Sequence, residues 1–96
     1  MITLHFKDGA EMTSQEAAAL LRKEGRLGIG HYCDLNGLRC LTGGLENHSI
    51  GKEGGWLEQD TVLDLFSKGL DARANDDFVG TPEERCEHFA RLFEQL

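Results

Sequence analysis

The stretch TPEERCEHFARLFEQL, residues 81–96, carries the clearest structural signal in this 96-residue chain. A threonine followed by a proline and two glutamates is typical of a helix start, because the threonine caps unpaired N–H groups and proline fits the first helical position. Apolar side chains then recur at helical spacing: Cys86, Phe89, Ala90, Phe93 and Leu96. We predict a C-terminal helix that buries this stripe and runs to the end of the sequence.

Two more helices are predicted upstream. Thr13 and Glu16 have the spacing of a capping box, and Gly25 is placed to end the helix that follows. A further helix is expected within residues 58–73, with Asp60 as its N-cap and Gly69 inside it. The buried face predicted for that helix consists of Val62, Leu65, Phe66 and Leu70. We expect residues 75–80, NDDFVG, to form a loop.

Two tight turns predict β-hairpins. Residues 2–12 alternate apolar and polar side chains around Asp8-Gly9, and Asn36-Gly37 favours a second two-residue turn. Strand alternation around that second turn places His31, Cys33, Leu35, Leu38 and Cys40 on one face. The expected fold is therefore α+β: a single small domain over residues 1–96, with an N-terminal hairpin, an Asn-Gly hairpin and three main helices.

The cysteines raise the question of a metal or redox site. Cys33, Cys40 and His31 could supply three zinc ligands, but six residues separate the cysteines instead of the two of a zinc knuckle. Free cysteine often behaves as a small buried hydrophobe, so we predict packed thiols, no metal and no cofactor. The alternative is a module built around Cys40, either a zinc site or an enzyme in which His31 or His48, with Asn75 or Asp76, activates the thiol.

The charge of the chain is negative and uneven. Of a net −7, residues 57–96 carry −6, from ten acidic and four basic side chains. Such a surface repels nucleic-acid phosphates and attracts a basic protein partner. We therefore expect no direct contact with nucleic acid.

The N-terminus lacks the pattern of a signal peptide, and no apolar run reaches the length of about 20 residues that a membrane span needs. An odd number of cysteines without an export signal is typical of free thiols in a reducing compartment. We expect a cytoplasmic protein that does not enter the membrane.

Three patches of the chain, GIGHY, NGLRCLTGGL and NDDFVGTPEERCEHFARLF, resemble a family of short bacterial and phage proteins described only as a domain of unknown function. The motif positions that correspond are Arg39, Cys40, Gly43, Gly44, Asn75, Asp76 and Thr81. The resemblance implies that Cys40 and the glycines pack a strand end against the helices, and that Asn75 and Thr81 cap helix ends. It also implies a small accessory or mobile-element protein.

From these observations we predict a non-catalytic protein-binding module that inhibits or modulates a host system. The predicted binding residues are the acidic side chains of the C-terminal part: Asp60, Asp64, Asp76, Asp77, Glu83, Glu84 and Glu87. Two other classes stay open, the cysteine-centred enzyme or zinc module and a purely structural oligomer.

Overall fold

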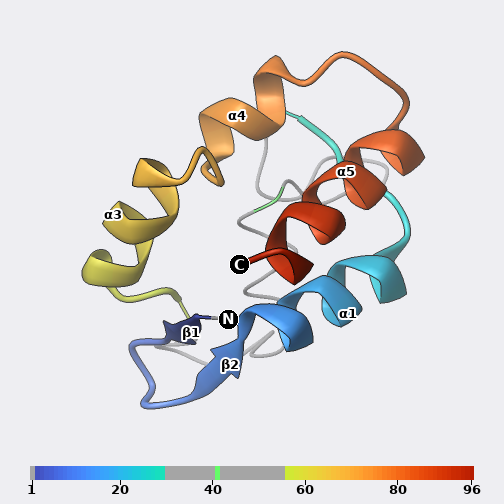
Figure 1. The fold of residues 1–96 in the computed structure, drawn as a ribbon. Coiled ribbons are helices and arrows are strands. Elements are labelled where there is room, and N and C mark those ends of the chain that lie inside the picture. Colours follow the sequence, from blue (N-terminus) through green and yellow to red (C-terminus); the bar gives the residue numbers. More distant parts are fainter. Residues whose placement is uncertain (1, 30–40, 42–55) are drawn as a thin grey trace.

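A computed structural model describes residues 2–29, 41 and 56–96 of the protein. The fold combines a small antiparallel sheet with helices (Figure 1), which confirms the predicted α+β class. Its described elements are β1 (Thr3–His5), β2 (Glu11–Thr13), α1 (Ser14–Glu24), α3 (Gln59–Ser67), α4 (Ala72–Asp77) and α5 (Pro82–Glu94). The predicted Asn36-Gly37 hairpin, with His31, Cys33 and Cys40, lies outside the described residues.

The N-terminal hairpin forms as predicted. β1 and β2 pair antiparallel, with Leu4 opposite Met12, and both of these side chains are buried. Gly9 adopts a positive φ of 89° in the turn, a conformation that glycine adopts without steric cost. The Asp8 carboxylate closes the turn by accepting a hydrogen bond from the N–H of Ala10 at 2.9 Å.

The other edge of β1 pairs with the segment that leads into α3. Phe6 and Leu57 form an isolated antiparallel bridge. The N–H of Glu58 donates to the carbonyl of His5 at 2.8 Å, and the hydroxyl of Thr61 accepts from the N–H of His5 at 3.1 Å. These bonds fix the start of α3 at Gln59, so the prediction that Asp60 is the N-cap is wrong: Glu58 occupies that position.

Helices α1 and α5 lie side by side (Figure 1) and enclose much of the core. Both begin with complete capping boxes. The box of Thr13 with Glu16 is the predicted one, and Thr81 is the predicted N-cap of α5, where it forms a box with Glu84. The predicted stripe is buried at Cys86, Phe89, Ala90 and Phe93. The prediction that the helix runs to the end of the sequence is wrong, because α5 ends at Glu94, and Leu96 beyond it is only partly buried. The two helices are joined at their surface by Arg22, which pairs with Glu87 at 3.0 Å and with Glu94 at 2.6 Å.

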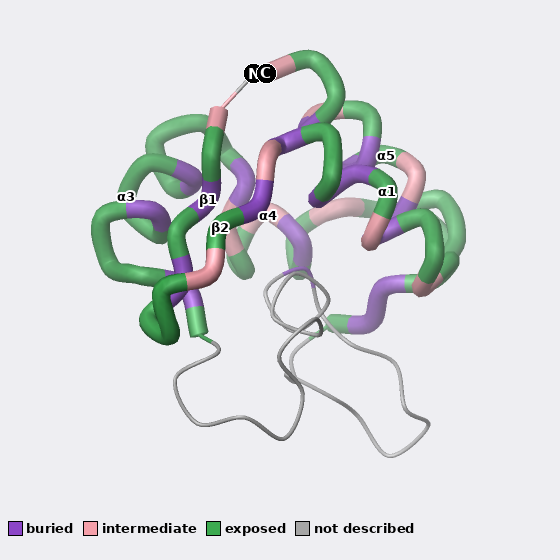
Figure 2. The backbone as a smooth tube through the Cα atoms, turned by 90° about the horizontal axis from the view of Figure 1, so that it is seen from below, coloured by how far each residue is buried: buried purple, intermediate pink, exposed green. Residues whose placement is uncertain are grey.

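Helices α3 and α4 lie apart from that pair (Figure 1) and are shorter. α3 ends at Ser67, so Gly69 is not inside the helix as predicted but in the turn that follows, with a φ of 72°. Only Thr61 and Leu65 of its nine residues are buried, and Figure 2 shows the helix as mostly exposed. The helix therefore contributes one narrow buried stripe to the core.

Candidate functional site

The predicted acidic residues are distributed over three helices. Asp60 and Asp64 lie on α3, Asp76 and Asp77 on α4, and Glu83, Glu84 and Glu87 on α5. These seven carboxylates therefore do not come from a single helix. The groups on α3, α4 and α5 have different neighbours.

Two of the α5 carboxylates already stabilise the fold. Glu84 accepts a hydrogen bond from the N–H of Thr81 at 2.9 Å, and this bond, more than any other effect, holds the pKa of Glu84 below its ordinary value. Glu87 accepts from Arg22 and from Arg91, and these bonds lower the pKa of Glu87 in the same way. Whether these carboxylates also bind a partner stays a prediction.

The α4 acids belong to a helix that the sequence analysis predicted as a loop. Asp71 caps this helix, because its carboxylate accepts from the N–H of Ala74 at 3.2 Å. Asp76 accepts from the side-chain amide of Asn75 at 3.2 Å, and Asp77 lies 3.8 Å from Arg73. Aspartate is a frequent N-cap residue, so Asp71 was the signal that could have located this helix.

A buried polar cluster was missed by the sequence analysis. Arg85 is 6% exposed, and its guanidinium donates to the carbonyls of Asn75, Leu27 and Phe78 at 3.0–3.2 Å. Asn75 is fully buried within α4 and donates to the carbonyl of Gly28 at 2.9 Å, so it does not cap a helix end. Arg85 and Asn75 thus connect α4 and α5 to the segment after α1, which is a structural role.

The surface of α3 differs from the prediction in a way that matters for binding. Val62, Leu63 and Phe66 are 42%, 57% and 62% exposed, so the prediction that Val62 and Phe66 are core residues is wrong. The reason is Thr61: its hydrogen bond to His5 turns it and Leu65 toward the interior, which leaves Val62 and Phe66 at the margin. Large apolar side chains gathered on one exposed helix are typical of an interaction surface.

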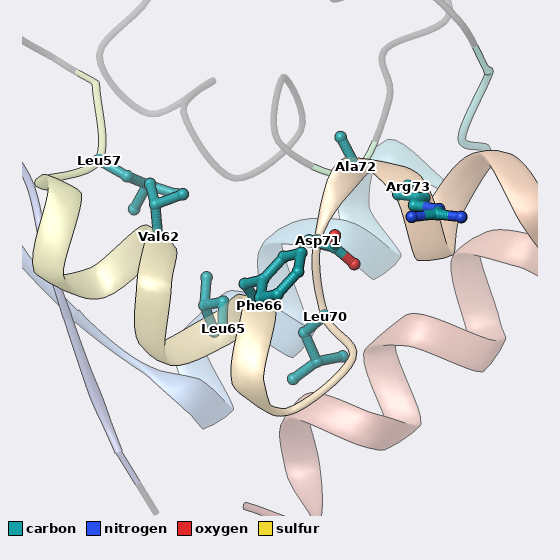
Figure 3. A pocket seen from close by; sticks show the side chains of 8 residues that line it. All are labelled: Leu57, Val62, Leu65, Phe66, Leu70, Asp71, Ala72 and Arg73. Atoms are coloured by element: carbon teal, nitrogen blue, oxygen red, sulfur yellow. The ribbon is translucent and has the colours of Figure 1, made fainter.

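Beside these side chains, the described residues enclose an apolar groove of about 230 Å³. Figure 3 shows Leu57, Val62 and Phe66 along one side and Ala72 and Arg73, at the start of α4, on the other. Leu65 and Leu70 also line it. One acid and one base, Asp71 and Arg73, mark its polar end.

The exposed face of α3 passes from apolar to acidic around the helix. Successive residues are rotated by about 100°, so Asp60 and Asp64 share a side that is turned well away from Val62 and Phe66. Leu63 lies between the two groups. Asp64 also pairs with Lys68 at 2.6 Å, whereas no ion pair of Asp60 is found among the described residues. We call the set Asp60, Val62, Leu63, Asp64 and Phe66, with the adjoining groove, the α3 surface.

The described residues contain no group of three or more His, Cys, Asp and Glu side chains that could hold a metal ion. Cys86 is buried and donates its S–H to the carbonyl of Leu21 at 2.9 Å, whereas His88 is exposed. Burial raises the pKa of the Cys86 thiol, which disfavours the reactive thiolate. Cys86 is therefore a core residue, as predicted. Cys40 lies outside the described residues.

Comparison of the chain with models of protein families, with curated proteins and with solved structures gives no match. The resemblance to the family of short bacterial and phage proteins therefore stays a prediction. Among the helices of the described ranges, none has both the length and the apolar composition needed to cross a bilayer.

Proposed function

We propose that this protein is a small, non-catalytic module that binds a protein partner with a basic surface, and that the α3 surface makes the contact. The observation that carries the proposal is the exposure of Val62, Leu63 and Phe66 on the same short helix as Asp60 and Asp64. Interfaces commonly combine apolar anchors, which supply most of the affinity, with charged residues that steer the encounter.

The distribution of the other acids supports this choice of surface. Glu84 and Glu87 are engaged in helix capping and in the contact between α1 and α5, so reversing their charge would disturb the fold as well as any binding. Asp60 and Asp64 lie on an exposed helix that also carries Val62, Leu63 and Phe66, on the side of the helix turned away from Val62 and Phe66. The proposed partner is a component of a host system that this module inhibits or modulates.

The test is affinity capture from the native cell with the intact chain and two variants of equal net charge. The α3 variant carries Asp60→Lys and Asp64→Lys, and the control variant carries Glu11→Lys on β2 and Glu83→Lys on α5. We expect one protein to be captured by the native chain and by the control at comparable yield, and to be lost from the α3 variant. Equal capture by all three chains, or equal loss from both variants, would refute the proposal.

A further inference from the structure

We draw no further inference here: the strongest candidate, the apolar groove between α3 and the start of α4, belongs to the α3 surface already described, and nothing in the described part of the structure shows what covers it.

Discussion

The α1–α5 pair and helix α3 of the α3–α4 region are amphipathic, yet they use their apolar side chains differently. In the pair, both helices are capped at the N-terminus and turn their largest apolar residues, such as Phe89 and Phe93, into the core. In α3, Phe66 is mostly exposed. Helical periodicity alone therefore does not say whether an apolar stripe is core or interface, because the neighbours of the helix decide its rotation.

The largest expected effect is a difference in the free energy of unfolding between a substitution in the core of the α1–α5 pair and one on the surface of α3. Phe93→Ala removes a fully buried ring and should lower the free energy of unfolding by about 3–5 kcal/mol, whereas Phe66→Ala should change it by less than about 0.5 kcal/mol. Urea denaturation followed by circular dichroism measures both. Phe93→Leu, with an expected loss nearer 1 kcal/mol, keeps the comparison measurable if Phe93→Ala does not fold. Similar losses for the two alanine variants would mean that α3 is as much a part of the core as α5.

A smaller effect is expected where the two regions meet. Arg85 donates to carbonyls of three segments, so Arg85→Met should leave these buried acceptors unpaired and cost about 2–3 kcal/mol. Arg85→Lys should rescue little of this loss, because an ammonium group lacks the planar fork of a guanidinium. The free energies of unfolding of both variants test this role. Full stability in Arg85→Lys would show that the positive charge alone is required.

The smallest expected effect is on the pH dependence of stability, which the capping box of α5 influences through Glu84. The pKa of Glu84 is held below its ordinary value of 4.5 in the folded chain, so its contribution to stability is present above that pH and is lost as the pH falls through the folded pKa. Glu84→Gln keeps a hydrogen-bonding side chain at this position but cannot titrate. Its unfolding midpoint should therefore fall less steeply on acidification than that of the native chain.

The matched control for this prediction is Glu83→Gln, which removes the neighbouring charge and leaves the capping box intact. It should retain the acid dependence that Glu84 causes. An identical acid response in Glu84→Gln and the native chain would contradict the assigned role of the capping carboxylate.

The sequence predicted those features that depend on nearby residues. The hairpin at Asp8-Gly9 and the starts of α1 and α5 follow from turn and capping signals within a few positions, and all three are confirmed. The rotation of α3 depends instead on a hydrogen bond between Thr61 and His5, 56 positions apart, which no local pattern reveals.

The candidate site was predictable only in part. Asp60 and Asp64 were identified from charge, but Phe66 was assigned to the core because large apolar residues usually lie there. Arg85 was missed for the converse reason, since arginine is rarely buried. In both cases, contacts from distant segments override the average preference of the residue type.

The central claim, that α3 is a binding surface and the α1–α5 pair is the scaffold, is tested most directly by NMR. The ¹⁵N-labelled chain is titrated with the protein captured from the native cell, and amide shifts are mapped onto the structure. The account predicts that the largest shifts fall within residues 59–73 and that the buried positions of α5, such as Ala90 and Phe93, change little. Shifts centred on α1 and α5, or spread evenly over every acidic side chain of the molecule, would contradict it.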